Sequence, residues 1–182
     1  MLILIKMKTT IHQKIVKETF EEYKDLKNVI GIVNFGSVAI GKERKDSDVD
    51  IYIVFKNNVK WNIFREKRHG IKVDFEVVGK KDFLKYTKKY PYLYYFQHDK
   101  ILLDKDGTIK QVFDHLRNYF KKNKKVNDFW KDEYKIMRDK KKKGEREKHF
   151  AEVCDEAEKR FSPHHSIKRK ILTKNWFNKH DN

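Results

Sequence analysis

Two aspartates separated by one residue, Asp48 and Asp50, stand at the start of an apolar run and are candidates for binding a divalent metal ion. Alternate side chains of a β-strand point to the same face, so both carboxylates are expected on one face. Two neighbouring carboxylates repel each other unless a cation lies between them. Mg²⁺ prefers such oxygen ligands and keeps coordination sites open for the phosphates of a substrate. The spacing therefore predicts a metal site.

A Gly-Ser pair, Gly36 and Ser37, precedes the two aspartates and could contact phosphate. Gly36 has no side chain that would block a close approach, and the Ser37 hydroxyl can donate a hydrogen bond. A Gly-Ser turn or an Asp-x-Asp strand start, taken alone, is common in proteins without any function. Here each motif is attached to its own apolar segment, 30–35 and 51–55, and the combination favours a phosphate-and-metal site.

A third segment, residues 71–78, alternates cleanly between two faces and predicts another strand. One of its faces carries Lys72, Asp74, Glu76 and Val78. From the alternation alone, the simplest interpretation is that this polar face is exposed to solvent at the edge of the sheet. The direction of the strand depends on residues 56–70, because a hairpin would make it antiparallel to the strand at 51–55. A helical crossover through 58–69, where Trp61 and Phe64 have helical spacing, would make it parallel.

The segments Phe35-Gly36-Ser37 and Ser47-Asp48-Val49-Asp50-Ile51 together resemble the signature of the DNA polymerase β-like nucleotidyltransferase superfamily, in particular its minimal nucleotidyltransferase type. The resemblance covers roughly residues 10–105. It implies an α+β fold, with a nucleotidyltransferase-like mixed sheet flanked by helices and followed by an α-helical C-terminal region. Many members carry arginines just after the Gly-Ser pair, where this chain has Val38 and Ile40.

The resemblance also implies a reaction, the transfer of a nucleoside monophosphate from a nucleoside triphosphate to an acceptor with release of pyrophosphate. ATP is the default donor. Two Mg²⁺ ions would be held by Asp48, Asp50 and a third carboxylate on a neighbouring strand, while Gly36 and Ser37 would contact the phosphates.

Two residues compete for the role of third carboxylate. Asp74 best matches the apolar-Asp-apolar setting of the family and is the expected ligand; Glu76, on the same strand face, is the alternative. The acceptor is open, since related proteins modify small molecules such as aminoglycosides, RNA ends or protein side chains. A different interpretation is a non-catalytic nucleotide- or nucleic-acid-binding protein, or an antitoxin partner, that retains the fold.

The remaining segments predict mainly helices. Residues 10–27 form the first, with a capping box of Thr10 and Gln13 and with Leu26 on its apolar stripe. Asp104 and Asp106 are expected to form a turn and not to bind metal. From Thr108 onward an apolar stripe predicts helix, at Ile109, Val112, Phe113, Leu116 and Phe120. We therefore expect a catalytic domain over residues 8–106 and a helical, basic region over 107–182, whose last residues, 162–182, have no interpretable pattern.

The 182 residues carry 44 Lys or Arg against 27 Asp or Glu, a net charge of +17, which suggests an anionic partner or equally a compositional bias. Residues 121–150 alone hold 13 basic against 6 acidic residues. This run is either a solvated helix face or a contact surface for an anionic acceptor such as nucleic acid. The single cysteine, Cys154, excludes an internal disulfide and fits the cytoplasm. The apolar segment Leu2–Ile5 is too short to span a membrane.

Overall fold

The computed structural model describes residues 9–92, 99–140 and 142–162. The chain divides into two compact units. The first comprises Met1–Lys89 with Tyr95–Leu116, and the second comprises Tyr90–Tyr94 with Arg117–Asn182. The division falls inside helix α4 (Thr108–Lys122), so this helix contributes residues to both units.

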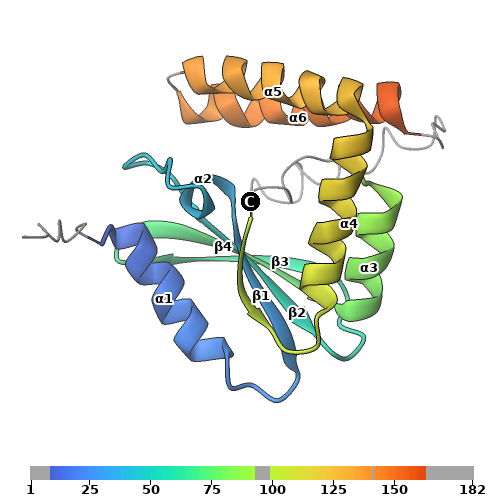
Figure 1. Ribbon diagram of the computed structural model, residues 1–182. Helices are drawn as coiled ribbons and strands as arrows, with labels where there is room; N and C mark the ends of the chain where they lie inside the picture. The colour runs from blue at the N-terminus through green and yellow to red at the C-terminus, as the bar shows by residue number, and fades with distance from the viewer. Residues whose placement is uncertain (1–8, 93–98, 141, 163–182) are drawn as a thin grey trace, which may run out of the picture. The chain divides into compact units, whose positions relative to one another are not determined.

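The first unit is built on a five-stranded mixed sheet with the strand order β3-β4-β2-β1-β5 (Figure 1). Strands β2 and β4 are parallel, and the other neighbouring pairs are antiparallel. The strands are β1 (Val29–Phe35), β2 (Val49–Phe55), β3 (Asn62–Arg68), β4 (Ile71–Gly79) and β5 (Lys100–Asp104). The mixed sheet with flanking helices confirms the predicted α+β fold.

The connection from β2 to β4 is neither the simple hairpin nor the helical crossover that the sequence left open. It contains the edge strand β3, which pairs antiparallel with β4 and places β4 parallel to β2. His69 and Gly70, at φ values of 50° and 80°, make the turn between β3 and β4. A helix was wrong for this segment because Phe64 lies opposite Phe75 in the strand register, and the two rings stack with centroids 4.7 Å apart.

Helices cover both faces of the sheet in the first unit. Helix α1 (Ile11–Tyr23) lies on one face, and α3 (Lys80–Lys89) with the first part of α4 lies on the other (Figure 1). Alternation along β2 divides its apolar side chains between two cores, because Ile51 packs on the α1 side whereas Tyr52 packs on the α3 side. The carboxylates of Asp50 and Asp74, described below, lie on the face of Tyr52.

Helix α1 begins as predicted and ends early. The Thr10 hydroxyl accepts from the backbone N–H of Gln13, and the Gln13 side chain accepts from the backbone N–H of Thr10, both at 3.2 Å, which confirms the capping box. The predicted end at residue 27 is wrong, because the helix ends at Tyr23 and a turn follows. Leu26, placed on the apolar stripe, is 47% exposed because the turn carries it off the helix face.

Asp104 and Asp106 form the turn that starts α4, as predicted. Asp106 accepts from the backbone N–H of Thr108 at 3.1 Å, and Asp104 accepts from the N–H groups of Ile109 and Lys110 at 3.3 and 2.8 Å. Both therefore satisfy donors at the first turn of the helix. The apolar stripe predicted for this helix is buried at all five positions, Ile109, Val112, Phe113, Leu116 and Phe120.

The second unit contains the pair of helices α5 (Lys124–Asp139) and α6 (Lys143–Phe161). His149 on α6 lies 2.9 Å from the Glu133 carboxylate on α5, and the indole of Trp130 donates to the carbonyl of Tyr92 at 2.7 Å. Within the described ranges, no helix has the length and apolar character needed to cross a membrane. The terminal segment that gave no pattern lies, after residue 162, outside the described residues.

Candidate active site

The parallel pairing of β2 with β4 brings Asp50 and Asp74 side by side. They are direct partners in the strand register, and Phe35, the last residue of β1, is the partner of Asp50 on its other side. The turn that follows β1 therefore lies at the same edge of the sheet as the two aspartates. Three segments that are distant in sequence meet here, and they carry all the residues predicted for the site.

Gly36 lies against the carboxylate of Asp50. A β-carbon at position 36 would stand 2.4 Å from Asp50 Oδ2, and the backbone there has a φ of +73°. Both observations require glycine at this position. Gly36 and Ser37 begin a short helix, α2 (Gly36–Ala39). The side-chain amide of Asn34 donates to the backbone carbonyl of Asp50 at 3.1 Å and fixes the two strands at this point.

Two cations from the same face of the sheet approach the aspartates. The ammonium of Lys72 lies 3.2 Å from Asp48 Oδ2 and also 3.2 Å from Asp74 Oδ2, so it joins the two carboxylates. Arg65 Nε on β3 lies 3.3 Å from Asp74 Oδ1. That oxygen is buried and accepts no well-formed hydrogen bond from the described residues, so the contact with Arg65 is an ion pair without hydrogen-bond geometry.

The electrostatic environment penalises negative charge on Asp50. Its pKa is raised from 3.8 to about 8, mainly by burial and also by the carboxylates of Asp74, Asp48 and Glu76, while Lys72 opposes the shift. A carboxyl group in this situation ionises readily only when more positive charge arrives. The site therefore has too little positive charge to keep Asp50 ionised, even with Lys72 in place.

Glu76, the alternative third carboxylate, has other partners. It is the register partner of Tyr52, one strand repeat beyond the pair of Asp50 with Asp74. The indole of Trp61 donates to Glu76 Oε2 at 3.1 Å. Burial raises the pKa of Glu76 to about 7, although hydrogen bonds from Tyr52 and Trp61 oppose that shift. The geometry therefore places Asp74, and not Glu76, beside Asp50.

Two further polar residues contact the site, and the sequence motifs did not include them. His12 on α1 is only 4% exposed, and its Nε2 lies 3.1 Å from the carbonyl oxygen of Ser47, so it holds the segment just before Asp48. No local pattern signals this long-range contact.

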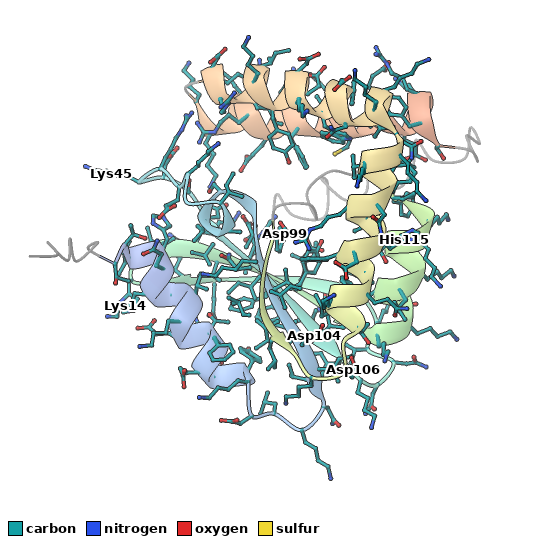
Figure 2. All side chains as sticks on the ribbon, in the orientation of Figure 1. Lys14, Lys45, Asp99, Asp104, Asp106 and His115 are labelled. Atoms are coloured by element: carbon teal, nitrogen blue, oxygen red, sulfur yellow. The ribbon has the colours of Figure 1, made fainter. Side chains whose placement is uncertain are left out.

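The second is Asp99, which is 8% exposed and lies at the end of β5 opposite to Asp104 and Asp106 (Figure 2). Burial raises its pKa well above the usual range, and the charges of Asp50 and Glu76 add to this, whereas a hydrogen bond from the Gly36 N–H opposes it. Asp99 Oδ2 is buried and has no hydrogen-bond partner in the part of the chain that the structure describes. Its signal in the sequence is the one that marked Asp48, an aspartate just before an apolar strand.

The donor set fits a divalent cation chemically. Carboxylate oxygens are the ligands that Mg²⁺ prefers. Among the described residues, no three His, Cys, Asp or Glu side chains already converge as they would around a metal ion. Instead, the Lys72 ammonium lies between Asp48 and Asp74, where such a cation would lie. A positive charge therefore already occupies this position. The raised pKa of Asp50 indicates that the site would accept further positive charge.

A mixed sheet with helices on both faces, a Gly-Ser turn and aspartates on two parallel strands together define a nucleotidyltransferase fold. Residues 13–108 match the family described as Polymerase beta, Nucleotidyltransferase. The match covers more than half of the chain, and the chain belongs to this family. Membership supports nucleotidyl transfer as the general kind of reaction.

A solved structure of a nucleotidyltransferase-like protein from Exiguobacterium sibiricum 255-15 is similar to this chain at 11% sequence identity, with a TM-score of 0.44. The similarity covers 91% of this chain and 61% of that one, so this chain spans less than two thirds of the length of its structural relative. Among curated proteins, none matches the sequence.

Proposed function

We propose that this protein transfers a nucleoside monophosphate, AMP from ATP in the first instance, to an acceptor and releases pyrophosphate. One observation carries the proposal. Asp50 and Asp74 are register partners on parallel strands, and the Asp50 carboxylate lies against the Gly36 turn. This arrangement supports the proposal, because carboxylate oxygens of the kind that Mg²⁺ prefers lie next to a backbone with no side chain to keep a triphosphate away.

In this proposal Asp48, Asp50 and Asp74 hold two Mg²⁺ ions. When bound, the two ions neutralise the phosphates and lower the pKa of the acceptor hydroxyl. Gly36 lets the phosphates of the leaving group approach the backbone closely, and Ser37 presents its backbone N–H and its hydroxyl to them. Asn34 and His12 keep β2 and the segment before Asp48 in position through their contacts with backbone carbonyls.

Asp74 is also the proposed acceptor of the proton that leaves the attacking hydroxyl. Its Oδ1 is buried and pairs with Arg65, so the proton would be received at Oδ2, the oxygen that Lys72 contacts in the metal-free protein. General-base assistance requires such contact within about 3 Å. Glu76 is less suitable because its carboxylate already accepts from Trp61.

For the acceptor, we propose an anionic molecule bound through the basic helical region, with residues 8–106 as the catalytic domain and 107–182 as the acceptor-binding region. Net charge favours this, because residues 121–150 carry 13 basic against 6 acidic side chains. Each phosphate contact made by Lys or Arg steepens the slope of log affinity against log salt concentration by about one unit. Glutamine at positions 140–143 should therefore reduce acceptor affinity and flatten its salt dependence; an unchanged slope would mean that the run is only solvated.

The test of the reaction uses two radiolabelled nucleotides in parallel. Cell extract is incubated with the protein, Mg²⁺ and ATP labelled at either the α- or the γ-phosphate. Nucleotidyl transfer leaves the α-label on an acceptor and releases the γ-label as pyrophosphate, whereas a kinase would put the γ-label on the acceptor and leave the α-label in ADP. Titration of Mg·ATP into wild-type protein and Asp50→Asn then separates the alternatives. Binding of nucleotide without label transfer would favour the non-catalytic binding protein or antitoxin partner.

A further inference from the structure

We propose that Lys72 is an exchangeable internal cation, which neutralises the metal-free site and must leave when a divalent metal ion binds. Lys72 would thereby set the metal affinity of the site. This inference rests on the proposed function in one respect, the assignment of Asp48 and Asp74 as metal-binding carboxylates.

The position of the ammonium is the first support. Lys72 Nζ lies 3.2 Å from one oxygen of Asp48 and 3.2 Å from one oxygen of Asp74. Mg²⁺ binds carboxylate oxygens at about 2.1 Å, a much shorter distance than these ammonium contacts. Both carboxylate oxygens would therefore have to approach the cation more closely when a metal ion replaces the lysine.

The second support is that Lys72 can leave without disturbing the core. Its side chain is 35% exposed, whereas those of Asp48 and Asp74 are 13% and 18% exposed. A lysine has a flexible four-carbon stem and a strongly hydrated head, so solvent can receive the ammonium at small cost. Arg65 pairs with Oδ1 of Asp74, the other oxygen, and need not move.

The charge balance around the lysine is the third support. Two cations, Lys72 and Arg65, face a larger group of carboxyls at this edge of the sheet, namely Asp48, Asp50, Asp74, Glu76 and Asp99. Exchange of the lysine for a divalent ion adds one positive charge beside these carboxyls. A lysine and a metal ion held together between the same carboxylates would repel each other.

Removal of the lysine should therefore have two opposite effects. The metal-free protein loses stability, because Asp48 and Asp74 lose their shared counterion. The affinity for a divalent ion rises, because the ion no longer competes with a resident cation. A structural ion pair would give the first effect alone. A lysine that assists metal or phosphate binding would give weaker binding on removal.

The experiment compares wild-type protein with Lys72→Gln, Asp50→Asn and the matched control Lys67→Gln. Lys67 lies opposite Lys72 in the β3–β4 register, is exposed and gives the same change of net charge. Mn²⁺ is titrated without nucleotide and followed by electron paramagnetic resonance, and melting temperatures are measured in EDTA. We expect Lys72→Gln to bind Mn²⁺ about tenfold more tightly, the size of effect that a neighbouring unit charge has on a carboxylate. It should also melt at a lower temperature in EDTA, and Lys67→Gln should match wild type in both measurements.

Each other outcome is decisive. Unchanged or weaker Mn²⁺ binding by Lys72→Gln, while wild type binds and Asp50→Asn does not, overturns the exchange and leaves the proposed function standing. Equal tightening by Lys67→Gln overturns it as well, because the effect would then be one of overall charge. If wild type and every variant bind Mn²⁺ as poorly as Asp50→Asn, the carboxylates bind no metal, and the proposed function fails together with the exchange.

Discussion

The carboxylate of Asp50 lies so close to Gly36 that a β-carbon on the glycine would stand 2.4 Å from Asp50 Oδ2. A local turn at the end of β1 and a side chain at the start of β2 thus form one structural unit. This contact leads to the first of four predictions.

Gly36→Ala should destabilise the protein and abolish nucleotide binding. The left-handed backbone at Gly36 costs a non-glycine residue about 1 kcal/mol or more, and the added methyl group displaces the Asp50 carboxylate. The control is Gly41→Ala, since Gly41 has a similar φ of +66° with no described atom within 4 Å of an added β-carbon. Melting temperature and Mg·ATP titration measure the two effects. Equal loss in both variants would mean that only backbone strain matters.

Asp48→Asn and Asp50→Asn should each reduce metal-dependent turnover by several orders of magnitude and leave the fold intact. Asparagine keeps the shape of the side chain but removes the charge that attracts a divalent ion. Asp114→Asn provides the same charge change at an exposed residue that pairs with Lys110 on α4. Turnover is measured by pyrophosphate release and folding by circular dichroism. Full activity in either site variant would exclude the proposed mechanism.

The choice between Asp74 and Glu76 predicts unequal effects of two conservative variants. Asp74→Asn should lose turnover at saturating Mg·ATP, because Asp74 is the register partner of Asp50. Glu76→Gln should keep most of it, since the glutamine oxygen can still accept from the Trp61 indole. The reverse order of effects would transfer the role to Glu76 and leave the fold unchanged.

The stability of the metal-free protein should fall as pH rises from about 4 to about 8. Burial raises the pKa of Asp50 from 3.8 to about 8, so in this interval the native state holds a proton that the unfolded chain has lost. The stabilisation that comes from the proton on Asp50 is fully present below the unfolded pKa of 3.8 and is lost as the pH rises through the native pKa of about 8. Denaturant unfolding in EDTA across this range checks the sign. Asp50→Asn should have a weaker pH dependence and, at pH 8, greater stability than wild type; an identical profile would contradict the assignment.

The sequence by itself determined the motifs and the strands that carry them. Apolar segments such as 30–35 and 51–55 are strands because burial and alternation are properties of contiguous residues. The capping box of Thr10 and Gln13 was equally predictable, since its two partners are three residues apart. The resemblance carried by the Gly-Ser and Asp-x-Asp motifs implied the fold, and the family match over residues 13–108 agrees with it.

Only the tertiary structure decided which residues meet. The edge strand β3 and the parallel direction of β4 depend on pairing partners, and Trp61 and Phe64 fit a helical spacing as well as a strand. The approach of Lys72 to Asp48 joins segments that are distant in sequence, as does the contact of Asp99 with Gly36. The local sequence pattern indicates on which face of a strand a side chain lies. The register between strands sets which charges share that face at contact distance, and it is fixed by packing across the whole sheet.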